Sequence, residues 1–201
     1  MKQFFFFGDS ITLGVGDQGF VGWPAVLAQM LSAQGAIAHP DTIYNLGVRK
    51  NSSADIAARW RQEFQRRHIQ GTEACLIFCF GTVDMAAPQG RPNIPADESA
   101  ANARNILSEA QQSGNVLLVS PPPVADSAHS ARLVSLSKAY AAVCAELSVP
   151  FVDLFQTLHA SDFLQDLADG VHPGAEGNRL IAAALLHSNG LKILLRQAIN
   201  A

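Results

Sequence analysis

The chain has 201 residues, of which 48% are hydrophobic and 15% are charged. This balance is typical of one soluble globular domain with a sizeable core, so we expect a single domain spanning residues 1–201. Fourteen basic and seventeen acidic residues give a formal net charge of −3. That charge argues against nucleic acid as a partner, because phosphate binding needs a clustered basic surface. The densest basic segment, Arg59–His68, is explained by a solvated helix face.

The N-terminal segment contains an apolar run of only four residues, Phe4–Phe7. An export signal needs roughly 7–15 apolar residues, and a membrane span needs roughly 20. Three cysteines are too few, and odd in number, for a disulfide framework, which fits a reducing compartment. We therefore expect a cytoplasmic protein without a membrane span, in which Cys75 and Cys79 are core residues.

Short apolar runs alternate with longer helical stretches along the chain. Runs that are apolar without alternation are typical of parallel strands covered on both faces. The predicted strands are Gln3–Gly8, Thr42–Leu46, Ala74–Phe80, Asn115–Ser120 and Pro150–Leu154. The predicted helices are Pro24–Gln34, Ser53–His68, Asp97–Ser113, Ala128–Leu147, Gly174–Ser188 and Leu191–Ala201.

This alternation predicts an α/β fold, a three-layer α/β/α sandwich built with right-handed crossovers. By analogy with flavodoxin-like folds, we expect a five-stranded parallel sheet with strand order 2-1-3-4-5. Ligands bind such sheets beyond the carboxyl ends of the strands. The loops that follow the predicted strands are therefore the places to look for functional residues.

The first of these loops reads Gly8-Asp9-Ser10-Ile11. A serine just past a buried strand and a glycine can hold its hydroxyl at the sheet edge on a sharp turn, as a nucleophile requires. A plain turn in which Ser10 caps a helix would give the same short pattern.

The loop after the last strand reads Asp169-Gly170-Val171-His172-Pro173. A hydrolytic serine needs a base within hydrogen-bond reach, and that base needs a partner for its second ring nitrogen. Asp169 and His172 can supply both from a single turn. Two other interpretations are a capping aspartate beside a surface histidine, and a metal pair, for which a third ligand at suitable spacing is not apparent. The remaining histidines have no acidic residue placed like Asp169.

Together these segments resemble the first and last blocks of the GDSL, or SGNH, hydrolases. Asn45-Leu46-Gly47 and Ser120-Pro121-Pro122-Pro123 resemble blocks between them, in the same order. The resemblance implies that Ser10 is the nucleophile, that His172 is the base and that Asp169 orients His172. It also implies that the backbone amides of Ser10 and Gly47 form the oxyanion hole.

One block departs from the family pattern Gly-x-Asn-Asp, whose asparagine is a third oxyanion donor. Here the segment reads Gly81-Thr82-Val83-Asp84, and valine cannot donate a hydrogen bond. Loss of such a donor costs on the order of 10²–10³ in turnover in a well-studied protease. Three outcomes are left open: hydrolysis supported by the two backbone donors alone, recruitment of another donor by the chain, or a drift towards binding without catalysis.

The segment Gly14–Gly19 matches the dinucleotide-binding pattern. That motif must follow its strand at once and open a helix, with an acidic residue ending the next strand. Here it begins six residues after Gly8, and the next strand ends in Asn45-Leu46-Gly47. We therefore interpret it as a glycine loop beside Ser10.

The sequence thus predicts a serine hydrolase that cleaves ester or thioester bonds of small-molecule substrates through an acyl-enzyme, with no cofactor and no metal. Its alternatives are a catalytically weak relative that binds an ester or carbohydrate ligand, and a flavodoxin-like binding domain. Phe20 and Trp23 are candidates for the site entrance, and core packing is the other explanation for both.

Overall fold

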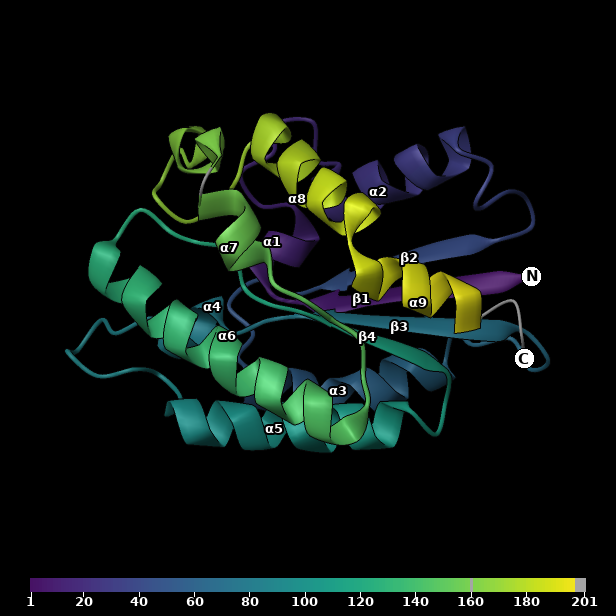
Figure 1. Ribbon diagram of the computed structural model, residues 1–201, viewed down its shortest axis with the longest axis horizontal. Helices are drawn as coiled ribbons and strands as arrows, with labels where there is room; N and C mark the ends of the chain where they lie inside the picture. Colours follow the sequence, from purple (N-terminus) through teal and green to yellow (C-terminus); the bar gives the residue numbers. More distant parts are fainter. Residues whose placement is uncertain (160, 198–201) are drawn as a thin grey trace.

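The structure is a computed structural model that describes residues 1–159 and 161–197 (Figure 1). Within these residues, five parallel strands form one sheet in the order β2-β1-β3-β4-β5. They are β1 (Lys2–Gly8), β2 (Thr42–Gly47), β3 (Glu73–Cys79), β4 (Asn115–Val119) and β5 (Phe151–Val152). The predicted fold class and strand order are confirmed.

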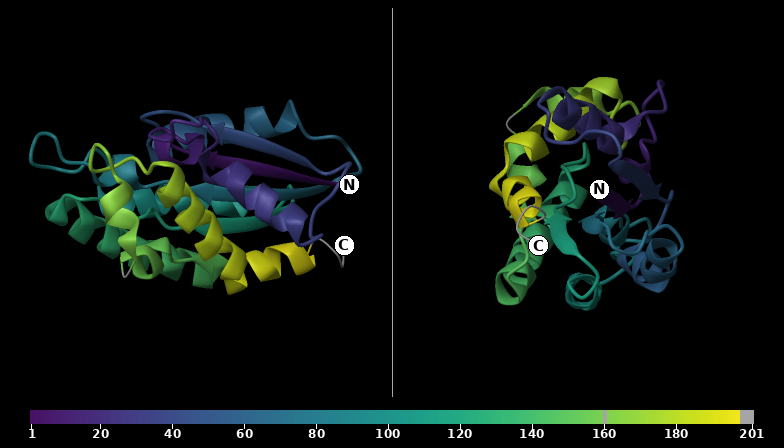
Figure 2. Two further views of the ribbon diagram at one scale, coloured as in Figure 1. Left: turned by 90° about the horizontal axis from the view of Figure 1, so that it is seen from above. Right: turned by 90° about the vertical axis from the view of Figure 1, so that its right-hand side faces the viewer.

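Helices cover both faces of the sheet, and Figure 2 shows these layers from two further sides. One face packs against α3 (Ser53–Gln65), α5 (Ala96–Ala110) and α6 (Ser127–Leu147). The other packs against α2 (Gly22–Ala33), α8 (Ala175–His187) and α9 (Asn189–Gln197). Shorter helices are α1 (Ser10–Leu13), α4 (Thr82–Met85), α7 (Leu154–His159) and the 3₁₀ helix η1 (Asp162–Asp166).

Most predicted element bounds lie within three residues of those observed. The last strand is shorter than predicted, because Leu154 already begins α7 and only Phe151–Val152 pair with β4. Ser52 caps α3 and forms a reciprocal bond with Asp55, and Asp97 lies inside the first turn of α5. The last residues of the helix predicted over Leu191–Ala201, numbers 198–201, lie outside the described residues.

The four phenylalanines of β1 fill both cores, because successive side chains of a strand point to opposite faces. Phe5 and Phe7 belong to the core under α3, α5 and α6, and Phe4 and Phe6 to the core under α2 and α8. All four are at most 2% exposed. The continuous apolar run in the sequence therefore marks a strand that is covered on both faces.

The side chain of Asn178 connects α8 to α2 and to the loop before α8. It is fully buried, and its Oδ1 accepts a hydrogen bond from the Trp23 amide at 2.9 Å. Its Nδ2 donates to the carbonyl oxygens of Pro173 at 3.1 Å and Gly174 at 2.8 Å. Asn178 thereby fixes the segment that directly follows His172.

Asn178→Ala should therefore destabilise the protein by about 1–3 kcal/mol, because it leaves buried backbone groups without partners. Urea unfolding followed by circular dichroism measures the change. Asn105→Ala, on the exposed face of α5, is the matched control and should stay within about 0.5 kcal/mol of wild type. Equal effects of the two substitutions would contradict this role of Asn178.

Candidate active site

Ser10 lies on a sharp turn at the carboxyl end of β1. The Oδ1 of Asp9 accepts a hydrogen bond from the Ile11 amide at 2.9 Å and caps α1, whose first residue is Ser10. A Cβ at Gly8 would lie only 2.1 Å from Thr12 Oγ1 and 2.3 Å from the Cys79 carbonyl oxygen. The close approach of β1, α1 and β3 therefore requires glycine directly before Asp9.

The structure brings Ser10, His172 and Asp169 together. The Oγ of Ser10 lies 2.8 Å from His172 Nε2, and His172 Nδ1 lies 2.6 Å from Asp169 Oδ2. The other carboxylate oxygen of Asp169 accepts from the amides of Val171 at 3.0 Å and His172 at 2.8 Å. A hydroxyl, an imidazole and a carboxylate connected in this order can transfer a proton away from the hydroxyl.

Asp169 is ionised at neutral pH. Burial raises its pKa, but hydrogen bonds from the His172 amide, the His172 ring and the Val171 amide outweigh burial and lower the pKa to about 2. Stability from this carboxylate is therefore present above about pH 4 and is lost as the pH falls towards about 2. At neutral pH the negative charge favours a proton on Nδ1 of His172, which leaves Nε2 free to accept the Ser10 hydroxyl proton.

The glycine motif Gly14–Gly19 packs against the histidine segment. Gly16 has φ +101°, and a Cβ there would lie 2.7 Å from the Pro173 carbonyl oxygen and 3.0 Å from His172 Cβ. The carboxylate of Asp17 closes this loop by accepting from the amides of Gly19 and Gly22 at 2.8 and 3.1 Å. The motif thus allows a close approach between two segments of the chain.

The two aromatic residues considered for the site entrance have different environments. Trp23 is fully buried and packs edge-on against Phe6, so it is a core residue. Phe20 is 91% exposed and adopts φ +57°. Neither side chain lines the cavity around Ser10.

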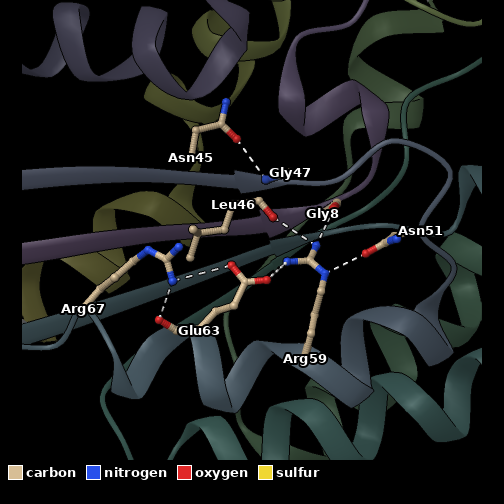
Figure 3. Close-up of polar contacts among 8 residues, drawn as sticks. All are labelled: Gly8, Asn45, Leu46, Gly47, Asn51, Arg59, Glu63 and Arg67. Carbon is tan, nitrogen blue, oxygen red and sulfur yellow. Dashed lines mark hydrogen bonds and ion pairs between the residues drawn. The ribbon is translucent and has the colours of Figure 1, made fainter.

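The guanidinium of Arg59 connects the ends of β1 and β2 to the following loop (Figure 3). Its Nη2 donates to the carbonyl oxygens of Gly8 and Leu46, both at 3.0 Å, and its Nε donates to Asn51 Oδ1 at 2.6 Å. Its Nη1 pairs with Glu63 at 2.8 Å. Arg59 is therefore not on a solvated face as expected from the sequence, since its side chain is only 18% exposed.

Gly47 lies at the end of β2, but its amide has a partner within the protein. The N–H of Gly47 donates to Asn45 Oδ1 at 3.0 Å, and Asn45 Nδ2 donates to the Thr12 carbonyl oxygen at 2.9 Å (Figure 3 shows the first bond). Gly47 does not line the cavity around Ser10, whereas Arg49 and Lys50 from the same loop do. The role of Gly47 as an oxyanion donor stays a prediction.

Ser10 and His172 open into a cavity of about 460 Å³, a size suited to a small molecule. Its other lining residues are Arg49, Lys50, Thr82, Val83, Ala86, Asn93, His129 and Val171. Val83 is therefore at the cavity, as its place in the motif predicts. Asn93 carries an amide to the same wall, where its Nδ2 donates to the Val83 carbonyl oxygen at 2.8 Å.

His129 is a cavity residue that the sequence did not identify. It lies in the first turn of α6, and its Nε2 is 2.9 Å from the Thr82 carbonyl oxygen. Burial lowers the pKa of His129, although the bond to Thr82 opposes this effect. The neutral ring thus donates to Thr82 and forms a polar part of the wall.

In residues 1–159 and 161–197, no three His, Cys, Asp or Glu side chains are grouped in a way that could hold a metal ion. No helix within these ranges combines the length and apolar character that crossing a bilayer demands. Cys75, Cys79 and Cys144 are buried free thiols, and burial raises the pKa of Cys75 to about 12.

Comparison with known proteins agrees with this fold. Residues 6–180 match the GDSL-like lipase/acylhydrolase family. A lipase/acylhydrolase from Enterococcus faecalis superposes with a TM-score of 0.78 at 22% identity, covering 98% of this chain and 97% of that one. An acetylxylan esterase from Geobacillus stearothermophilus gives 0.74 at 20% identity and covers 92% of each chain. No curated protein matches the sequence.

The chain therefore belongs to the GDSL-like lipase/acylhydrolase family, and the resemblance of its sequence blocks to that family is confirmed. Lipases and acylhydrolases act on esters, so hydrolysis of esters in general is the activity of this family.

Asp9, the residue before Ser10, is a buried carboxyl group. Burial raises its pKa to about 7. The negative charge of Asp84 also raises this pKa, whereas the hydrogen bond from the Ile11 amide lowers it. Its Oδ2 has no hydrogen-bond partner among the described residues. Between about pH 4 and about pH 7 the folded protein therefore binds more protons at this site than the unfolded chain, and stability falls as the pH rises.

Asp9→Asn should remove this dependence, because asparagine does not titrate and its Oδ1 can still accept from the Ile11 amide. The free energy of unfolding of the variant minus that of wild type should increase from about pH 5 to about pH 8. Urea unfolding at a series of pH values measures the difference. Parallel curves for the two proteins would show that Asp9 does not titrate in this range.

Proposed function

We propose that this protein is a serine esterase that hydrolyses ester or thioester bonds of small molecules through an acyl-enzyme. The observation that carries the proposal is the connected set of Ser10, His172 and Asp169, with distances of 2.8 and 2.6 Å, of which Ser10 and His172 line a cavity. The family supports ester chemistry independently. The cytoplasmic location, the single-domain organisation and the lack of a nucleic-acid partner stay predictions.

In the proposed reaction, His172 Nε2 accepts the proton of Ser10 while Oγ attacks the carbonyl carbon. The tetrahedral intermediate collapses, and the imidazolium gives its proton to the leaving alcohol or thiol. Water, deprotonated by the same nitrogen, then attacks the acyl-enzyme and releases the acid and free Ser10. Asp169 stays ionised and stabilises the imidazolium in both halves of the cycle. No step requires a metal or an organic cofactor.

The developing oxyanion needs donors that already point towards it. The Ser10 amide is one proposed donor, since the first amides of a helix have no partner within that helix. The Gly47 amide is the second, and it must release or share its bond to Asn45 when substrate binds. Val83 supplies no side-chain donor at the third position.

A binding protein with weak catalysis is the second candidate. Two observations favour it, namely the valine at position 83 and the bond that already occupies the Gly47 amide. Both weaken stabilisation of the transition state while leaving the cavity intact.

A fluorophosphonate probe distinguishes the two candidates. Wild type should gain the probe's mass on Ser10, because an activated hydroxyl attacks phosphorus as it attacks an ester. Ser10→Ala should gain none, and both Ser10→Ala and His172→Ala should lose about 10³-fold or more in turnover of 4-nitrophenyl acetate. Folded wild type that neither reacts with the probe nor hydrolyses esters would favour the binding protein.

Val83→Asn tests the incomplete oxyanion hole. A donor that acts only in the transition state raises kcat and leaves KM nearly unchanged. A complete donor is worth roughly 2.7–4 kcal/mol, and one without its supporting neighbours should recover about tenfold in kcat, or about 1.4 kcal/mol. Steady-state kinetics on a short-chain ester measures this gain, and Val83→Ala, which adds no donor, is the control. An equal kcat in the two well-folded variants would show that another group already fills the position.

A further inference from the structure

Two cationic side chains line the cavity around Ser10. Arg49 and Lys50 lie with Ser10 and His172 on its wall, and no carboxylate lines it. Among the residues that the structure describes, five other arginines form ion pairs with glutamates, whereas Arg49 and Lys50 form none. Two exposed cationic residues therefore line this cavity without an ion pair among the described residues.

The loop that carries these cations is strained at Lys50. Lys50 has φ +67°, a left-handed conformation that glycine adopts freely and a lysine side chain disfavours. The Asn51 amide closes the turn onto the Val48 carbonyl oxygen at 3.2 Å, and Asn51 Oδ1 accepts from Arg59 at 2.6 Å. A lysine at a position where glycine would be unstrained suggests that its charge has a use.

Three carboxylates on segments next to this cavity have hydrogen-bond partners of their own. Asp169 faces the His172 ring, and Asp55 accepts from the amide and the hydroxyl of Ser52. Asp84 accepts from the Ser53 amide and the Ser99 hydroxyl. None of these carboxylates forms an ion pair with Arg49 or Lys50, so both cations are free to pair with an anionic ligand.

We propose that Arg49 and Lys50 bind an anionic group of the substrate, so that the preferred substrates are esters or thioesters carrying a carboxylate or a phosphate. This inference rests on the proposed function. The apolar side chains of Val83, Ala86 and Val171 receive the uncharged part of the substrate in the same cavity. Arginine suits this role because its guanidinium can bind a carboxylate or a phosphate through two hydrogen bonds.

The test compares acetate esters of phenols that differ in one para substituent: 4-acetoxybenzoate, 4-acetoxyphenyl phosphate and the neutral 4-acetoxybenzamide. A second pair, the mono-4-nitrophenyl ester of adipic acid and 4-nitrophenyl hexanoate, places the charge on the acyl side. The readout is the ratio of kcat/KM for a charged ester to that for its neutral partner. This ratio cancels changes that affect all substrates equally, and the phosphate and carboxylate arms distinguish the two anions.

Wild type should prefer at least one charged ester, and Arg49→Gln with Lys50→Gln together should reduce that preference by about tenfold, mainly through KM. About 0.5 M NaCl should reduce it as well, because salt screens exposed charges. Lys50→Arg keeps the charge and should keep the preference. Lys192→Gln, on the distant helix α9, is the matched control and should behave as wild type.

Failure of this inference and failure of the proposed function are distinguishable. If wild type and the double variant have the same ratio of kcat/KM for charged and neutral esters, the inference of an anionic substrate is wrong. The proposed esterase function is not affected by that result. Wild type that hydrolyses none of these esters and does not react with the fluorophosphonate overturns both. If the double variant does not fold, Arg49→Gln alone and the salt dependence of the wild-type ratio decide the question.

Discussion

The burial of β1 on both faces is the constraint from which the rest of the structure follows. Its phenylalanines occupy two separate cores, one on each face of the sheet, and the strand is paired on both edges, with β2 and with β3. The register then aligns Gly8 with Gly47 on β2 and with Cys79 on β3. Because parallel strands end at the same edge, the segments after these residues converge there, and Ser10 lies among them.

The opposite end of the sequence reaches this edge through α8 packed beside α2. Asn178 fastens the first turn of α8 to the Trp23 amide and to the carbonyl oxygens just after His172. Gly16 lets the loop after α1 lie directly against His172. The 2.8 Å contact between Ser10 and His172, which are 162 residues apart, thus depends on packing between two helices of the same layer.

The arginines near the site show how burial and pairing determine what a charge can do. Arg59 is largely buried and pairs with Glu63. Its other N–H groups donate hydrogen bonds to the ends of β1 and β2 and to Asn51, so this side chain holds the backbone in place. Arg49 lies only ten residues earlier, yet it lines the cavity without an ion pair among the described residues. Glu63 therefore neutralises the charge of Arg59, whereas the charge of Arg49 remains available to a ligand.

The sequence by itself determined the fold class, the strand order by analogy and the segments that carry Ser10, Asp169 and His172. These features follow from apolar runs and short motifs. Both are local patterns that can be recognised along the sequence without knowing the tertiary contacts of each residue. Only the tertiary structure decided that Arg49, Lys50, Asn93 and His129 share a cavity with Ser10. Only the tertiary structure showed that the Gly47 amide donates to the Asn45 side chain and that the Arg59 side chain donates to the backbone at the end of β1. Such contacts depend on where loops from different strands meet and on which hydrogen-bond partner each polar group finds there, and neither periodicity nor spacing along the chain encodes this.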